Sequence, residues 1–174
     1  MRSAKDSRVK QKTNAARLLD GLGIAYELKL YEVDPDDLSV TNVARKIGLP
    51  TKQVFKTLLT VASTGEHYFA VVPGDRELDL KKMAAVVSVK QLELESLKKV
   101  EPLTGYVRGG VTVLAAKKAF TCVADYATET FDVISVSAGA RGTQLILAPA
   151  DYLRATSALL ADIGRDSGER IDLA

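Results

Sequence analysis

The chain has 174 residues, of which 47% are hydrophobic and 26% charged, and its formal net charge is +2. This length suits one domain with one core, and no apolar run approaches the roughly 20 residues that a membrane-spanning helix needs. A single cysteine, Cys122, excludes an internal disulfide and a cysteine-built zinc site. A Ser/His/Asp triad or Cys/His dyad is possible only if the one histidine, His67, is the base.

Positive charge is concentrated at the N-terminus. Residues 1–17 carry six basic side chains against Asp6, a net charge of +5, and we define residues 1–11 as the basic arm. Such a segment steers an anionic partner, and nucleic acid is the obvious candidate. A solvated, frayed terminus is the alternative. The segment lacks the apolar stretch of a secretory signal, so we expect a cytoplasmic protein.

Hydrophobic periodicity predicts alternating helices and strands in the first half of the chain. Expected helices cover residues 14–21, 40–47 and 80–87, and Asp79 is the expected N-cap of the third. Expected strands cover residues 25–32, 54–62 and 67–72, with a hairpin turn at 63–65. Alternation in the first strand places Tyr31 on its polar face.

The second half is richer in strands. A short helix is expected to end near Pro102, and the last helix is expected over residues 151–163, before a polar tail at 164–174. The strands expected between these helices cover residues 111–116, 120–124, 133–138 and 143–147. Neighbouring strands interleaved with helices predict a mixed sheet in an α+β domain that spans residues 12–163.

Several binding motifs are absent or interrupted. The sequence contains neither the phosphate-loop pattern nor G-x-G-x-x-G. Asp34, Asp36 and Asp37 resemble the start of a calcium loop, but Pro35 interrupts them and Arg45 occupies the closing position. Residues 139–142 match the bare G-x-x-G of KH domains, yet they join two strands, which favours a hairpin turn. We expect no metal site and no cofactor.

Lys56 lies in the apolar stretch 54–59. Burying its ammonium is costly unless a partner or ligand compensates, which makes Lys56 a candidate functional residue. The alternative is an edge-strand lysine that reaches solvent along its methylene stem. Ser135 and Ser137 share one strand face, which either lines a pocket or faces solvent.

The order of several short segments, from Lys12 to about Asp162, resembles the YbaK/EbsC family of aminoacyl-tRNA deacylases. This family is related to the editing domain inserted in bacterial prolyl-tRNA synthetases. The segments that carry the resemblance are residues 12–15, Tyr31, 53–58, 78–82, 104–106, 109–110, 117–118, 136–139 and 141–142.

The resemblance implies a mixed sheet curved into a partly closed barrel, with helices outside and a pocket for the aminoacylated 3′ end of tRNA. It implies that Lys56 is catalytic. It also implies that substrate is bound by Tyr31, Gly109, Gly110, Ser137, Gly139 and Arg141. In this family no protein nucleophile is required, because water or the thiol of a bound cysteine attacks the ester, giving hydrolase or lyase-type chemistry.

The activity implied by the resemblance is removal of the amino acid from mischarged tRNA(Pro), above all Cys-tRNA(Pro), with prolyl-tRNA synthetase as a possible partner. The chain departs from the family pattern at residues 111–116, where relatives often carry Ser-Pro and a later Gly, and at Gln144, where some carry an acid. A non-catalytic module that binds tRNA or a synthetase is one alternative. A small-molecule hydrolase of the same fold is another.

Overall fold

The computed structural model describes residues 12–168, so the basic arm lies outside the described residues. The helices and 3-10 turns are α1 (Asn14–Gly21), α2 (Val40–Ile47), η2 (Thr51–Gln53), α3 (Leu80–Val86), α4 (Leu97–Thr104), η3 (Tyr126–Thr130) and α5 (Pro149–Thr156). The strands are β1 (Glu27–Leu30), β2 (Phe55–Ala62), β3 (His67–Pro73), β4 (Arg76–Leu78), β5 (Leu92–Leu94), β6 (Thr121–Asp125), β7 (Ile134–Ser137), β8 (Thr143–Leu147), β9 (Leu159–Ala161) and β10 (Gly164–Asp166). The predicted α+β class is confirmed. Within residues 12–168 no helix is long and apolar enough to cross a membrane.

Local capping explains where the early helices begin and end. The Oγ1 atom of Thr13 accepts the Ala16 N–H at the start of α1, and Ser39 caps α2 in the same way. Gly48 ends α2 in the left-handed conformation, at φ 75°. Asp79 caps α3 as predicted, because its carboxylate accepts backbone N–H groups of the first turn.

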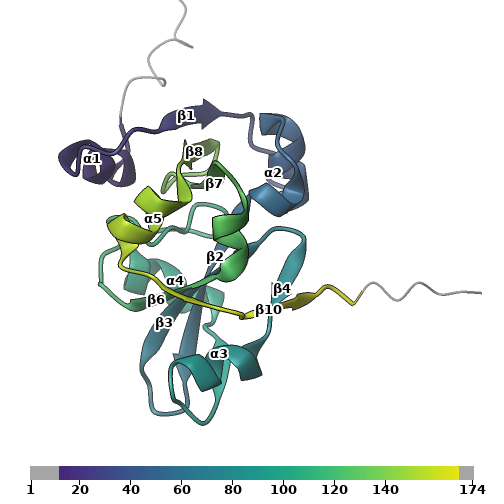
Figure 1. Cartoon of the computed structure of the whole chain (residues 1–174), viewed down its shortest axis with the longest axis vertical. Helices are drawn as coiled ribbons and strands as arrows, with labels where there is room; N and C mark the ends of the chain where they lie inside the picture. The colour runs from purple at the N-terminus through teal and green to yellow at the C-terminus, as the bar shows by residue number, and fades with distance from the viewer. Residues whose placement is uncertain (1–11, 169–174) are drawn as a thin grey trace, which may run out of the picture.

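The strands form three sheets. The largest has the order β5-β2-β3-β6-β9, in which β2 is antiparallel to β3 and to β5, whereas β6 is parallel to β3 and to β9. The second sheet, β1-β8-β7, is antiparallel, and β4 pairs with β10. A parallel bridge between Val54 and Ser135 links the first two sheets. In Figure 1 the second sheet lies above the largest one, with α1 and α2 beside it.

The two faces of the largest sheet bury different sets of apolar side chains. Phe55, Leu59 and Phe69 pack toward β7 and β8 in the main cluster. On the other face, α3 contributes Met83, which packs with Val72 in a second cluster. Each large apolar side chain removed from water stabilises the fold by roughly 1.5–3 kcal/mol. The strand β2 contributes to both clusters, which fixes its position firmly.

Three sequence expectations are wrong. Residues 111–116 form turns without strand pairing, and Ala115 has φ 55°. The last helix ends at Thr156, because Ser157 adopts the left-handed conformation, and β9 and β10 follow instead of more helix. Tyr31 packs beside α2 and is half-buried rather than on a polar face.

Other differences concern boundaries. The helix expected to end near Pro102 continues to Thr104, where Gly105 ends it at φ 81°. The first strand is limited to Glu27–Leu30, and the short strands β4 and β5 were not predicted. Residues 164–166, which were expected to begin the polar tail, form β10 and pair with β4.

Candidate active site

The candidate site lies along an edge of β2 that has no strand partner. On one side β2 pairs with β3 along residues 55–61. On the other side β5 pairs only from Thr60 onward, and the backbone pairing with β7 is limited to the isolated Val54–Ser135 bridge just before β2. Residues 55–58 between these two partners therefore form the open edge of β2. Because the Leu59 carbonyl accepts the Glu95 N–H, strand alternation directs the N–H and C=O of Thr57 to this same edge.

A cavity of about 470 Å³ lies at the open edge. This size fits the range of small-molecule sites. Six segments line it: the start of α2, the open edge, the β3–β4 turn, the β5–α4 segment, the loop up to Val111 and the facing ends of β7 and β8. The lining residues include Ser39, Val43, Lys56, Thr57, Gly74, Glu95, Val100, Arg108, Gly109, Ser137 and Gln144.

Lys56 is half-buried in the cavity wall. Burial lowers the pKa of its ammonium, and the nearby carboxylates of Glu77 and Asp75 counteract part of this effect. Within residues 12–168 Lys56 forms no salt bridge. Its charge is therefore available to an anionic or polar ligand in the cavity, which fits the functional interpretation of the apolar stretch around it.

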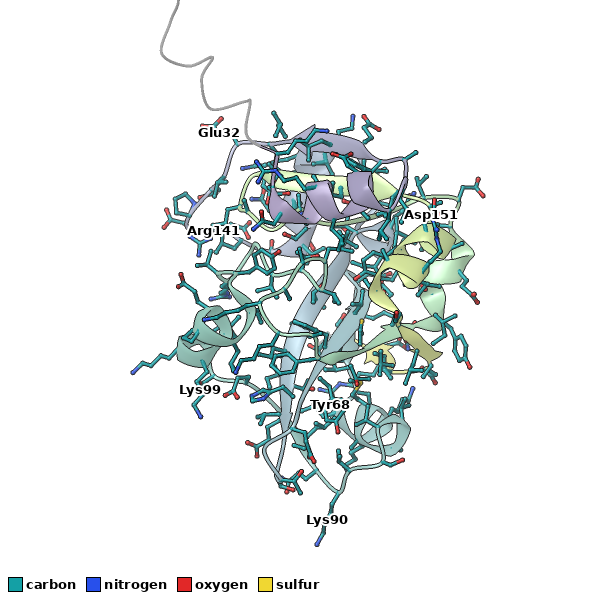
Figure 2. The ribbon with its side chains drawn as sticks, turned by 90° about the vertical axis from the view of Figure 1, so that its left-hand side faces the viewer. Glu32, Tyr68, Lys90, Lys99, Arg141 and Asp151 are labelled. Atoms are coloured by element: carbon teal, nitrogen blue, oxygen red, sulfur yellow. The ribbon has the colours of Figure 1, made fainter. Side chains whose placement is uncertain are left out.

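Gly109 lines the same cavity as Lys56. The glycine turn at residues 139–142 packs against the loop that carries Gly109. Gly109 has φ 85°, a conformation that favours glycine. Arg141, labelled in Figure 2, does not line the cavity, but its Nε donates to the Arg108 carbonyl at 2.8 Å. A Cβ on Gly110 would lie 3.2 Å from the Ala140 backbone. Gly110 and Arg141 therefore hold the loop that forms the wall.

Gly139 does not line the cavity either, but it packs against Tyr106. A Cβ at Gly139 would lie only 2.8 Å from Cε1 of Tyr106. The Tyr106 hydroxyl donates to the Leu114 carbonyl at 2.7 Å, and this contact ties the glycine turn to residues 111–116. Gly139 thus leaves room for the aromatic ring that orders the loop.

Ser137 and Gln144 face each other as partners of β7 and β8, and both line the cavity. The Ser137 Oγ accepts the Gly139 N–H at 3.2 Å. The Gln144 Oε1 accepts from Ser135 Oγ at 2.9 Å, so Ser135 is buried behind the wall. Gln144 is thus a neutral amide with a structural partner.

Tyr31 does not line the cavity. Its ring packs against the α2 cluster of Val43, Ala44 and Ile47, and its N–H donates to the Gly142 carbonyl at 3.0 Å. Among the expected site residues, the structure thus brings Lys56, Gly109 and Ser137 to one cavity. The other four, Tyr31, Gly110, Gly139 and Arg141, lie outside its lining.

Sequence reasoning missed Glu95, Arg108 and Gly74. Arg108 directly precedes the paired glycines, which is the one signal that could have found it. Glu95 gives no signal in the sequence, because its role depends on pairing between β5 and β2. Gly74 is needed for space: a Cβ there would lie 2.4 Å from Val40 Cγ1 and 2.6 Å from the Thr51 carbonyl oxygen.

The side chains most often used as nucleophile or base do not suit those roles here. Burial raises the pKa of the Cys122 thiol to about 12, so the reactive thiolate is scarce at neutral pH. The Nε2 of His67 bonds Glu95 at 2.7 Å. Within residues 12–168, no group of three or more His, Cys, Asp or Glu residues is arranged to hold a metal ion.

Similarity to known proteins is extensive. The chain is 38% identical over 156 residues to a candidate Cys-tRNA(Pro)/Cys-tRNA(Cys) deacylase named EbsC from Enterococcus faecalis, covering 90% of this chain and 95% of that protein. It is 32% identical over 101 residues to the multifunctional Ser/Thr-tRNA deacylase ProXp-y of Escherichia coli, covering 58% of this chain and 60% of that one.

A solved structure shares the fold. The crystal structure of a candidate trans-editing enzyme for prolyl-tRNA synthetase superposes with a TM-score of 0.73 at 22% identity, covering 87% of this chain and 97% of that one. The family model described as the aminoacyl-tRNA editing domain matches residues 34–155. The chain therefore belongs to the aminoacyl-tRNA editing domain family, and the predicted class of enzyme, an aminoacyl-tRNA deacylase, is confirmed.

Proposed function

We propose that this protein is a free-standing editing enzyme that removes the amino acid from mischarged tRNA(Pro), with Cys-tRNA(Pro) as the leading substrate. The observation that carries the proposal is the half-buried Lys56 on the open edge of β2, which forms no salt bridge within residues 12–168 and lines one cavity together with Gly109 and Ser137. The similarity to EbsC supports the choice of substrate. A substrate charged in the cytoplasm implies a cytoplasmic enzyme.

In the proposed complex the aminoacylated 3′ end enters the cavity. The Lys56 ammonium holds the terminal ribose or its phosphate as a compact point charge. Two backbone N–H groups, that of Gly109 and that of Thr57 on the open edge, stabilise the negative charge that develops on the ester oxygen. We infer that Gly110, Gly139, Arg141 and Tyr31 act indirectly, by fixing the loop and turn that carry these groups.

The ester is cleaved by addition of a nucleophile to the carbonyl carbon. In hydrolysis the water oxygen forms the new bond, the bond to the ribose oxygen breaks, and that oxygen takes up a proton, which releases the amino acid and tRNA. With a cysteine ester, the substrate's own thiol is the alternative nucleophile. Cys122 and His67 have no part in this scheme, in agreement with their burial and pairing.

The proposal is tested with the purified protein and tRNA(Pro) charged with Cys, Ala, Ser or Pro, and with Cys-tRNA(Cys). We expect rapid release from Cys-tRNA(Pro) and little release from Pro-tRNA(Pro). Faster cleavage of the Ser or Ala ester than of the Cys ester would overturn the assignment to cysteine. Tight binding of these tRNAs without cleavage of any of them would favour the non-catalytic module. A pull-down with prolyl-tRNA synthetase tests the proposed partner separately.

A further inference from the structure

Glu95 lies in the cavity wall at the opposite end of the open edge from Lys56. Its backbone N–H donates to the Leu59 carbonyl, and Leu59 follows Lys56 by three positions in β2. At 3.2–3.4 Å per strand residue, about 10 Å of strand separates the two ends. Among the described residues that line the cavity, Glu95 is the only acid.

Glu95 is half-buried, and its carboxylate is ionised. Only 7% of its side chain is exposed. The hydrogen bond from His67, followed by the N–H of Ser96 and the charge of Lys99, lowers the pKa of Glu95, although burial opposes the shift. His67 is fixed in turn by Phe120, whose ring centroid lies 5.1 Å from that of the imidazole. The carboxylate therefore has a defined position and charge.

The carboxylate retains capacity for a ligand. Its oxygens accept from His67 Nε2 at 2.7 Å and from the Ser96 N–H at 2.8 Å. An ionised carboxylate has about four acceptor sites, so two remain. A buried carboxylate prefers a cation as its next partner, because ionic hydrogen bonds are stronger than neutral ones.

We propose that Glu95 binds the α-ammonium group of the aminoacyl ester and makes the enzyme selective for substrates with a free α-amine. This inference rests on the proposed function, which supplies the ligand. The aminoacylated 3′ end carries negative phosphate at one end and an amine at the other, and the cavity has Lys56 and Arg108 as cations and Glu95 as its acid. Glu95 is a specificity-determining residue in this scheme, and it does not attack the ester.

The test measures binding, so that it does not depend on turnover. An RNA minihelix that ends in CCA carries alanine on its terminal ribose through an amide, with the α-amine either free or acetylated. For the intact protein we expect tighter binding of the free-amine form. Glu95→Gln keeps an acceptor for His67 but removes the charge, and it should weaken binding of that form about 10- to 100-fold. Binding of the acetylated form should change less than about three-fold.

Glu93→Gln is the matched control, because Glu93 lies two residues before Glu95, on β5, is exposed and does not line this cavity. It should leave the affinity for both minihelices unchanged. Equal weakening of both forms by Glu95→Gln, with a lower melting temperature, would show a purely structural ion pair and overturn the proposal. Unchanged affinity for both forms would also overturn it. Amine-selective binding without cleavage in the tRNA panel would refute the proposed function while supporting Glu95 as the amine site.

Discussion

From Thr60 to Ala62, β2 is hydrogen-bonded to β3 on one edge and to β5 on the other. From Phe55 to Leu58 the same strand is paired on one edge only and faces the cavity. Both halves contribute to the second apolar cluster, through Leu58 and Ala62. Rigid packing and free polar groups therefore coexist in one strand, because the site lies where β2 has a partner strand on one edge only.

The largest effect that this comparison predicts is on Lys56 in the open half. Lys56→Ala should lower deacylation of the preferred tRNA at least about 100-fold, because a preorganised charge at the reacting ester is lost. The melting temperature should change little. Lys56→Arg should also be inactive, since a planar guanidinium does not replace a compact ammonium. Lys52→Ala, at an exposed position nearby, is the control and should remain active.

Gly74 tests whether the open edge depends on close packing with α2 and η2. Gly74→Ala should reduce the free energy of unfolding by about 1–3 kcal/mol or more, because the added Cβ overlaps Val40 and backbone oxygens. Deacylation should fall as well, since Gly74 lines the cavity. Gly21→Ala is the control, with no atom within 4 Å of the new Cβ. A stable, active Gly74→Ala protein would contradict this packing.

In the half of β2 that is paired on both edges, residues 60–62, we expect a substitution to lower stability but not activity. The Thr60 hydroxyl donates to the Tyr68 carbonyl at 2.9 Å and is fully buried. Thr60→Val should reduce the free energy of unfolding by about 1 kcal/mol. Its kcat per folded molecule should match that of the intact protein. Denaturant unfolding and steady-state kinetics on the same samples separate the two effects.

The charge state of Lys56 gives a smaller, pH-dependent effect on stability. Because burial lowers its pKa below 10.5, the unfolded chain binds more protons than the folded protein between the lowered value and 10.5. The free energy of unfolding contributed by this residue therefore rises with pH across that window. Lys56→Met should be the more stable variant at neutral pH, and its advantage should shrink as the pH approaches 10.5. A constant difference in denaturant unfolding would argue against a buried ammonium.

The smallest effect is expected outside the cavity, from the basic arm. Deleting residues 1–11 removes four cations and one acid, a net charge of +3. Charges distant from the ester influence encounter rather than chemistry. The apparent KM for tRNA should rise, with weaker salt dependence and an unchanged kcat. If both proteins show the same salt dependence, RNA binding has to be sought around Lys81, Lys82, Lys117 and Lys118.

Sequence patterns predicted those elements that local chemistry determines. The bounds of α1 and α2 match the prediction, because caps and glycines define their ends. The apolar run 111–116 has the composition of a strand but finds no partner edge, and α5 stops early at Ser157, a position without glycine. These outcomes depend on tertiary pairing, which no local pattern encodes.

The same division applies to the candidate site. Lys56 could be found from the sequence because a cation in an apolar run is conspicuous. Its meeting with Gly109 and Ser137 depends on the bridge between Val54, just before β2, and Ser135 of β7. Glu95 enters the site only through the pairing of β5 with β2. The resemblance to a known family predicted that Gly109 and Ser137 share a site with Lys56. Hydrophobic periodicity alone does not indicate this.

The link between the two large sheets has a consequence for the order of events during synthesis. Gln53 donates its side-chain amide to the Val133 carbonyl, 80 residues further along the chain, beside the Val54–Ser135 bridge. The β2–β3 hairpin can thus emerge from the ribosome early, but the cavity has no opposite wall until β7 and β8 have been made. Such distant pairings slow folding, typically to about milliseconds or longer. The nascent chain should therefore acquire its hairpin well before it acquires a substrate pocket.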